Sequence, residues 1–311
     1  MTEIIPITSR DEWLALRKRD VTASVVAALF NAHQYTSARQ LYIDKTTDAV
    51  DEIDNAILRR GRLLESAVAA AVEEDFPHWK LRKADAYYRD PAIRLGATPD
   101  YFVDGDPRGL GVIQAKTVAP SAFKKSWTED GPPFWIACQT ITEMMLTGAK
   151  WGAVAALVVD PFRMDCKVYP VPRHPGMERR IREATAEFWI NADAGFEPEF
   201  DFAKDAELIA SLYPDATPLK SVDLTGDNML PGLLAERAEI KARSKIDEAR
   251  VKTIDAEVKA KMGDAEIATI AGFTITNKTT HRSGFEVKPT SFRALRITDN
   301  RPKEEVDSDE F

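Results

Sequence analysis

The sequence is poor in the side chains that bind zinc and in those that form disulfides. Its 311 residues include two cysteines, Cys138 and Cys166, and four histidines that stand singly along the chain. These numbers exclude zinc-type ligand spacing and a disulfide framework. Two cysteines in apolar surroundings favour a reducing compartment, so we expect a cytoplasmic protein.

Long apolar runs and strong positive charge are lacking as well. No run of about 18 apolar residues occurs, so no membrane-spanning helix is predicted, and Met1–Pro6 lacks the features of a signal peptide. The net charge of −8 argues against a protein that coats nucleic acid through bulk charge, although it leaves room for a local basic groove. The 44% of hydrophobic and 30% of charged residues predict a globular chain with one large domain, or one domain and a sizeable appendage.

The stretch that follows residue 100 predicts a β-hairpin. Tyr101–Val103 and Leu110–Ala115 are rich in apolar and β-branched residues. The segment 104–109 between them is dense in residues that turn a chain. The two runs should therefore pair as neighbouring strands.

Three polar side chains converge on this hairpin. Because strand side chains alternate, Gln114 and Lys116 project from one side of the second strand, near Asp100 at the mouth of the first. Carboxylate and amide oxygens suit a hard cation, and an ammonium group beside them would hold a phosphate or a nucleophilic water. An ordinary hairpin with solvated polar residues is the alternative.

A helix predicted over residues 55–75 contains a further candidate, Glu65. The middle of this helix is apolar nearly all round, so it should be buried. A carboxylate there is costly unless it is paired or bound to a metal. Three arginines lie within two turns of Glu65: Arg59, Arg60 and Arg62. They either pair with Glu65, or they face a phosphate backbone while Glu65 binds a metal.

A candidate phosphate site lies near the N-terminus. A capping box that begins at Ser9 opens a first helix, which carries Arg17 near its end. The apolar run Val21–Phe30 predicts a second helix that begins at Thr22 or Ser24, and the free N–H groups of a helix start suit a phosphate. Arg17 and Ser24 would share that anion; otherwise Ser24 only caps the helix.

A long helix is predicted from Phe134 to about Thr147, after two prolines and before Gly148. Gln139 lies among its core residues, where a polar amide needs partners. It contacts either a backbone phosphate near the metal or a core carbonyl. The next segment, Trp151–Val159, is almost continuously apolar, as a central strand covered on both faces would be.

The order of elements predicts three parts. Residues 1–205 form an α/β core with a mixed central sheet flanked by helices. Residues 206–298 form an extension with a long charged helix from Pro231 to Met262 and short strands over 272–277 and 291–297. Residues 299–311 carry Asp and Glu densely and are predicted to be disordered.

The candidate residues fall into five short motifs. In chain order they are Arg17 with Val21-Thr22-Ala23-Ser24, Gly61-Arg62-Leu63-Leu64-Glu65, Thr98-Pro99-Asp100, Ile113-Gln114-Ala115-Lys116-Thr117, and Gln139 ahead of Leu146-Thr147-Gly148. In this order they resemble the YqaJ-type viral recombinases, the group that includes the phage lambda exonuclease. That group belongs to the PD-(D/E)XK nucleases. The resemblance covers roughly residues 10–195, and the extension at 230–297 is similar to one that many phage members carry.

The resemblance implies a PD-(D/E)XK nuclease core and a metal-dependent exonuclease. Such an enzyme digests one strand of linear duplex DNA from 5′ to 3′ and leaves a 3′ overhang for an annealing protein. The implied partners are double-stranded DNA ends, a single-strand annealing protein and further copies of the chain in a ring-like trimer. For a phage-encoded protein, the compartment would be the cytoplasm of the bacterial host.

The same resemblance implies roles for single residues. Glu65, Asp100 and the Gln114 position would bind Mg²⁺, or Mn²⁺, and Lys116 would orient the attacking water. The terminal and scissile phosphates would be held by three further residues: Arg17, Ser24 and Gln139.

One position departs from the family pattern. The family usually has Glu where this chain has Gln114, whose amide oxygen can bind a hard cation but brings no charge. A catalytically weak or silent DNA-end-binding or assembly protein is therefore an alternative, and a RecB-like nuclease of different polarity is another. The presence of Glu65, Asp100 and Lys116 argues against a decayed site.

The acidic run at residues 304–311 ends on Phe311. It resembles the C-terminal tip of bacterial single-strand-binding proteins. This implies recruitment of a recombination or repair protein that binds such tips. A solvating tail without a partner is the alternative.

Overall fold

The computed structural model describes residues 1–47, 56–270, 272–280, 293 and 295–298. The chain divides into two compact units, Met1–Leu212 and Tyr213–Phe311. The first unit includes α7 (Ala206–Leu212), which the sequence analysis placed at the start of the extension. The candidate site residues all belong to the first unit.

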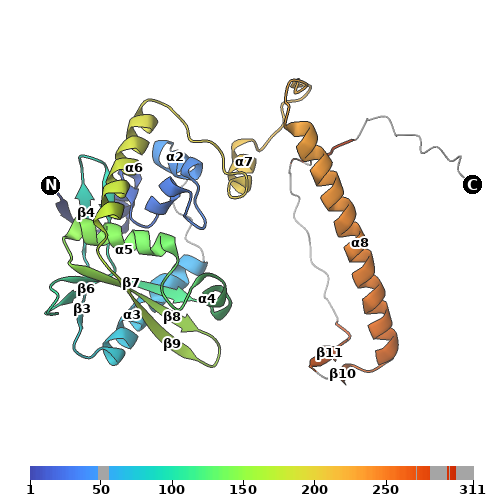
Figure 1. Ribbon diagram of the computed structural model, residues 1–311, viewed down its shortest axis with the longest axis horizontal. Helices are drawn as coiled ribbons and strands as arrows, with labels where there is room; N and C mark the ends of the chain where they lie inside the picture. Colours follow the sequence, from blue (N-terminus) through green and yellow to red (C-terminus); the bar gives the residue numbers. More distant parts are fainter. Residues whose placement is uncertain (48–55, 271, 281–292, 294, 299–311) are drawn as a thin grey trace, which may run out of the picture. The chain divides into compact units, whose positions relative to one another are not determined.

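A five-stranded mixed sheet forms the centre of the first unit, in the order β3-β6-β7-β8-β9 (Figure 1). Its strands are β3 (Lys80–Lys83), β6 (Tyr101–Asp104), β7 (Gly111–Val118), β8 (Trp151–Val159) and β9 (Met164–Val171). β7 and β8 run parallel, whereas the other neighbours run antiparallel. The hairpin predicted around residues 101–115 is β6 and β7, and it is confirmed.

Helices cover both faces of this sheet. α3 (Ala56–Asp75) packs on one face and α5 (Phe134–Thr147) on the other (Figure 1). The side chains of β8 alternate accordingly: Val154 joins the cluster that contains α5, while Ala153 and Ala155 join the cluster that contains α3. The predicted fold class, a mixed central sheet flanked by helices, is confirmed.

α5 begins and ends where the sequence predicts. Pro133 is its N-cap, and Gly148 ends it with a left-handed φ of 76°. The helix is buried from Ile136 to Leu146 except at Ala137, so its polar residues have to find partners inside the protein.

A second, four-stranded sheet has the order β1-β4-β5-β2. Its strands are β1 (Glu3–Pro6), β2 (Val21–Thr22), β4 (Ala86–Asp90) and β5 (Leu95–Ala97). The remaining helices of the first unit are α1 (Arg10–Arg19), α2 (Ala38–Thr46), α4 (Pro120–Ser126) and α6 (Pro175–Asp193). α1 starts at the predicted cap, because the Ser9 side chain accepts a hydrogen bond from Glu12 N.

Two local predictions are wrong. The segment Val21–Phe30 is not one helix: Val21 and Thr22 pair with β5 in parallel, and a short 3₁₀ helix, η1, covers Val26–Phe30. α3 is not buried all round, since only Val68, Ala69 and Val72 of its residues are buried and Leu63 is 66% exposed. The sheet covers one side of α3, and the small alanines on its other sides face solvent without a large apolar penalty.

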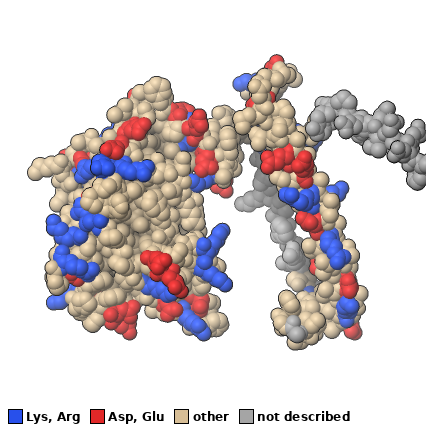
Figure 2. Space-filling view, in the orientation of Figure 1, with Lys and Arg blue, Asp and Glu red and all other residues tan. Residues whose placement is uncertain are grey.

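The second unit contains α8 (Leu230–Met262) and the antiparallel pair β10 (Ile267–Ile270) and β11 (Phe273–Thr276). α8 confirms the predicted long charged helix, and side chains of both signs lie along it (Figure 2). Residues 295–298 have no regular structure, so the strand predicted over 291–297 is not found in its described part. The acidic tail at 299–311 lies outside the described residues. Within the described part of the chain, no helix is long and apolar enough to cross a membrane.

Candidate metal and phosphate site

The β6–β7 hairpin brings Asp100 and Gln114 into contact. Tyr101 pairs with Ile113, which places the residue before β6 beside the middle of β7. Asp100 Oδ2 accepts hydrogen bonds from the Ala115 N–H at 2.8 Å and from Gln114 Nε2. Burial raises the pKa of Asp100 to about 6, the Lys116 charge lowers it, and the Glu65 charge raises it further.

A chain of side-chain hydrogen bonds continues from Gln114 to α5. Gln114 Oε1 accepts from Gln139 Nε2 at 2.7 Å, and the same nitrogen donates to Glu143 Oε1 at 2.9 Å. Gln139 Oε1 accepts from Lys116 Nζ at 3.1 Å. The predicted convergence of Asp100, Gln114 and Lys116 is therefore found, with Gln139 as the link between the amide and the ammonium group.

Glu143 also belongs to this series of hydrogen bonds, and the sequence did not predict its role. Its side chain is fully buried, and its second oxygen, Oε2, has no hydrogen-bond partner among the described residues. Burial, followed by the nearby Asp100 charge, holds the pKa of Glu143 well above its usual value. A signal was present in the sequence, because Glu143 stands one helical turn after Gln139 and is the only charged residue of the helix.

Glu65 lies at the edge of the same site. Its side chain is 24% exposed and forms an ion pair with Lys83 Nζ at 3.1 Å. Its charge also contributes to the raised pKa values of Asp100 and Tyr101, which places it close to both. Arg59, Arg60 and Arg62 are exposed on the turns of α3 that precede Glu65, and their contact with a phosphate backbone stays a prediction.

The predicted phosphate site takes a different form from the expected helix start. The N-cap of η1 is Val25, which makes no side-chain cap, so Ser24 does not cap this helix. Ser24 Oγ instead accepts from Arg17 Nη2 at 3.5 Å and lies 3.0 Å from the Thr22 hydroxyl. Arg17 and Ser24 are thus brought together, as predicted, but through a contact between their side chains and not at a helix start.

Lys45 joins this group from α2 and was not anticipated. Its Nζ donates to the Arg17 carbonyl at 2.6 Å. Burial lowers the pKa of Lys45 to about 8, and the Arg17 charge lowers it further. Two cations that are close together and partly desolvated form a surface that favours an anion.

His33 and Trp135 connect the two groups. His33 is hydrogen-bonded to the Ser24 backbone, and its ring lies 4.9 Å from the Trp135 ring in an edge-to-face arrangement. Lys116 Nζ lies 5.8 Å from the centre of the same Trp135 ring. Burial lowers the pKa of His33 to about 4, so this imidazole is neutral at neutral pH. A series of side-chain contacts through His33 and Trp135 therefore links the carboxylate–amide cluster to the Arg17–Ser24 cluster.

The oxygen atoms of the site fit a hard divalent cation, although they are not gathered around one point. No group of three His, Cys, Asp or Glu side chains in the described residues has a metal-binding arrangement. Asp100, Glu65 and the amide of Gln114 nevertheless supply the oxygen donors that Mg²⁺ and Mn²⁺ prefer. Glu143 Oε2 is a further carboxylate oxygen that has no hydrogen-bond partner among the described residues.

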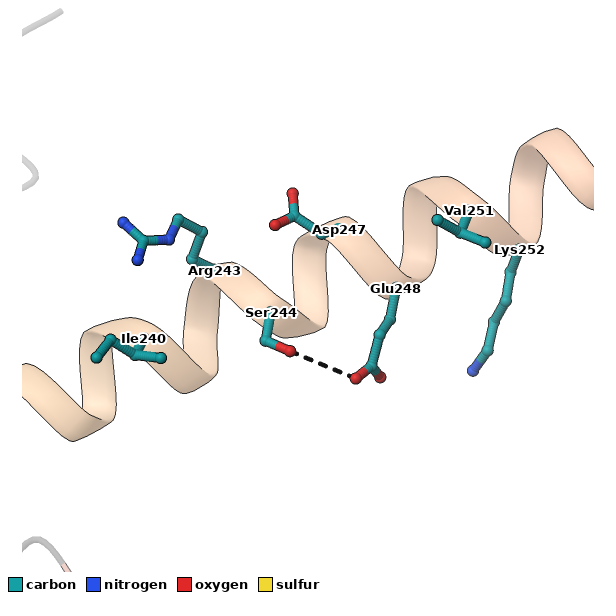
Figure 3. A pocket seen from close by; sticks show the side chains of 7 residues that line it. All are labelled: Ile240, Arg243, Ser244, Asp247, Glu248, Val251 and Lys252. Atoms are coloured by element: carbon teal, nitrogen blue, oxygen red, sulfur yellow. Dashed lines mark hydrogen bonds between the residues drawn. The ribbon is translucent and has the colours of Figure 1, made fainter. Parts of the chain in front are cut away.

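A separate groove runs along α8 (Figure 3). Seven residues line it: Ile240, Arg243, Ser244, Asp247, Glu248, Val251 and Lys252. Ser244 Oγ donates to Glu248 across it at 3.4 Å. All seven side chains belong to one exposed helix, so the groove cannot enclose a ligand, and it contains none of the candidate site residues.

A mixed sheet flanked by helices, with an acid, an amide and a lysine on one hairpin, is the arrangement expected of a PD-(D/E)XK nuclease core. Residues 12–150 match the YqaJ-like viral recombinase domain. The resemblance found in the sequence is confirmed.

The chain is also similar to individual proteins. It is 25% identical to the uncharacterized protein YqaJ of Bacillus subtilis (strain 168) over 271 residues, which are 85% of this chain and 82% of that protein. The crystal structure of LHK-Exo, an alkaline exonuclease from Laribacter hongkongensis, covers 64% of this chain and 99% of its own, with 23% identity and a TM-score of 0.48. The phage-related exonuclease from Haemophilus somnus 129PT covers 57% and 96%, with 11% identity and a TM-score of 0.40.

Proposed function

We propose that the protein is a metal-dependent DNA exonuclease that digests linear duplex DNA from 5′ to 3′ and leaves 3′ single-stranded overhangs for recombination by strand annealing. One observation carries the proposal. The hydrogen-bonded group of Asp100, Gln114, Gln139 and Lys116 lies within a YqaJ-like viral recombinase domain.

In this proposal Asp100, Glu65 and Gln114 hold Mg²⁺ or Mn²⁺. The bound ion supplies neutralisation of phosphate charge and a hydroxide at neutral pH. Lys116 places its ammonium group beside these oxygens, where it orients the attacking water and balances the charge of the scissile phosphate. Gln139 positions Lys116 through their 3.1 Å hydrogen bond.

In the same proposal, the Arg17–Ser24–Lys45 group binds the 5′-terminal phosphate. A guanidinium and an ammonium group supply charge, and the Ser24 hydroxyl supplies a further donor. Because His33 and Trp135 join this group to Lys116, an end phosphate held there would place the first phosphodiester bonds toward Asp100. This arrangement favours 5′-to-3′ polarity over the reverse.

The partners of this activity are double-stranded DNA ends and a single-strand annealing protein. The exposed arginines of α3 would contact the phosphate backbone of the duplex. A ring-like trimer around DNA and a place in the host cytoplasm follow from the resemblance to the viral recombinases and belong to the same proposal.

Digestion of linear duplex DNA tests the proposal. Substrates labelled at the 5′ or the 3′ end are incubated with the protein and Mg²⁺, Mn²⁺ or EDTA, beside covalently closed circles. We expect release of nucleotides from the 5′ end with either metal, no release in EDTA and intact circles. Release from the 3′ end would instead support the RecB-like alternative.

The neutral amide of Gln114 favours a second candidate, a silent protein that binds DNA ends. In that case the protein would bind the labelled duplex ends but would not shorten them at any metal concentration. Gel-shift and digestion measurements on the same substrates separate the two functions.

A further inference from the structure

Glu143 destabilises the folded protein at its position. It lies in the middle of α5 with no exposed surface, and Oε2 has no hydrogen-bond partner among the described residues. A buried carboxylate with one unsatisfied oxygen costs on the order of 1–3 kcal/mol or more relative to a satisfied group. A protonated carboxyl would not remove this cost, because its O–H at Oε2 would still lack an acceptor.

The position of Glu143 suggests what it is for. Its Oε1 bonds to Gln139 Nε2, which bonds to Gln114 Oε1, and Gln114 in turn bonds to Asp100. Glu143 is thus one amide away from the residue that stands in place of the family's third carboxylate. The cation site of the proposed nuclease has two carboxylates, Asp100 and Glu65, and is one negative charge short.

We propose that Glu143 is the third carboxylate of the cation site and supplies, through its unpartnered Oε2, the negative charge that Gln114 lacks. This inference rests on the proposed function, since it names a further ligand for the same metal. It assigns to α5 the carboxylate that the pattern of the family places on the hairpin, at the position of Gln114.

The separation of the carboxylates in the structure agrees with this role. Three carboxylates in direct contact without a positive ion would repel one another. The amides of Gln114 and Gln139 lie between Asp100 and Glu143 and keep the two charges apart. In the described part of the protein the three acidic side chains are accordingly not gathered around one point.

Binding of Mn²⁺ to the full-length protein without DNA tests the inference. Free Mn²⁺ is measured by electron paramagnetic resonance for the wild type, for Glu143→Gln, for Gln114→Glu and for the double variant. Glu143→Gln keeps the size and the hydrogen bond to Gln139 but removes the charge. We expect it to weaken Mn²⁺ binding about tenfold or more, with a Tm equal to or above that of the wild type.

The double variant makes the test specific. If Glu143 supplies the missing charge, then Gln114→Glu restores Mn²⁺ affinity in the Glu143→Gln background, and the two changes are not additive. Glu187→Gln, which removes one exposed glutamate charge from α6, is the matched control and should leave Mn²⁺ binding unchanged. Glu143→Met is a second uncharged variant in case Glu143→Gln does not fold.

The outcomes separate the inference from the proposed function. Wild-type binding that is lost in Asp100→Asn but unchanged in Glu143→Gln would overturn the role of Glu143 and leave the nuclease proposal intact. Additive effects in the double variant would also overturn it. A wild type that neither binds Mn²⁺ nor cleaves DNA would overturn both.

Discussion

Asp100 combines burial, hydrogen bonds and neighbouring charge in one side chain. Its pKa of about 6 lies above the ordinary value of 3.8, chiefly because burial disfavours the charged form. Between these two pH values the folded protein binds more protons than the unfolded chain. The contribution of Asp100 to the free energy of unfolding is therefore highest below about pH 4, and it falls as the pH rises to about 6.

Asp100→Asn should accordingly be more stable than the wild type at pH 8 and inactive as a nuclease. The gain in the free energy of unfolding is at most on the order of 3 kcal/mol, because the pKa of Asp100 rises from 3.8 to about 6. An asparagine oxygen still accepts the Ala115 N–H, so the hairpin is kept. Urea unfolding of both proteins between pH 4 and 8 measures the difference. Parallel stability curves for the two would show that Asp100 has an ordinary pKa.

Arg17→Ala should abolish a preference for 5′-phosphorylated over 5′-hydroxyl ends. Loss of a hydrogen-bonded charge at a phosphate is worth about 1.5–3 kcal/mol, or roughly tenfold and more in affinity. Initial digestion rates on the two kinds of end provide the measurement. Arg10→Ala, at the exposed start of the same helix, is the control. Equal discrimination by wild type and Arg17→Ala would remove Arg17 from the phosphate site.

The residues that the sequence predicted and those that it missed differ in how their partners are found. Asp100, Gln114 and Lys116 lie on one hairpin, so strand alternation alone brings them together. The partner of Lys45 is Arg17 on another helix, and only the packing of α2 beside α1 reveals it. Glu143 bonds to Gln139 on its own helix, and only the packing of α5 on the sheet links that pair to Gln114. Lys83, the partner of Glu65, is likewise on a strand remote in sequence from the expected arginines.

At the scale of elements, the close approach of β7 and β8 depends on Gly111. A Cβ at this position would overlap the ring of Trp151 on the neighbouring strand. That ring cannot move freely, since its centre lies 5.0 Å from that of the Trp79 ring and its Nε1 donates to Gly109 O at 3.0 Å. β7 carries both Gln114 and Lys116, so a shift at its start reaches the site.

Gly111→Ala should therefore destabilise the protein by about 1–3 kcal/mol, the range for overpacked interiors. Gly61→Ala is the matched control, because an added Cβ in the middle of α3 has nothing within 4 Å. That change should stabilise the helix by roughly 0.5–1 kcal/mol. Thermal unfolding of the three proteins compares them. A neutral Gly111→Ala would mean that the Trp151 ring can swing aside.

The elements that the sequence predicted correctly have local signals for their ends. α5 has Pro133 before it and a left-handed Gly148 after it, and both are visible in the sequence. β2 has no such signal, because Val21 and Thr22 become a strand only through parallel pairing with Leu95 and Gly96. The apolar run that continues to Phe30 then favours a helix over the true arrangement of strand and 3₁₀ turn.

At the scale of the whole molecule, the two units differ in how their helices are stabilised. α5 is buried for most of its length, whereas Met262 is the only buried residue among those of α8. A helix that packs on little of the described part of the protein depends mainly on its intrinsic propensity and on charge pairs such as Lys261 with Glu257. The site and its stability therefore belong to the first unit.

Hydrogen exchange should show this difference directly. Amides of α8 should exchange at least about tenfold faster than those of α5, since local opening of an unpacked helix requires little free energy. Exchange measured by mass spectrometry on the free full-length protein provides the test. Equal protection of the two helices would indicate that α8 is covered in solution, and repeating the experiment at several protein concentrations would show whether another copy covers it.

The amides between Asp100 and Lys116 have a fixed direction. Each nitrogen points toward Asp100 or Glu143, and each oxygen points toward the next donor, ending at the Lys116 ammonium group. If Gln114 turns its oxygen toward a cation, its nitrogen faces the nitrogen of Gln139, and two donors oppose each other. Gln139 then has to turn as well, and Lys116 loses its acceptor. If Gln114 binds a cation as proposed, the same rotation of the amides would release Lys116 from Gln139, and the lysine would then be free to meet a water or a phosphate.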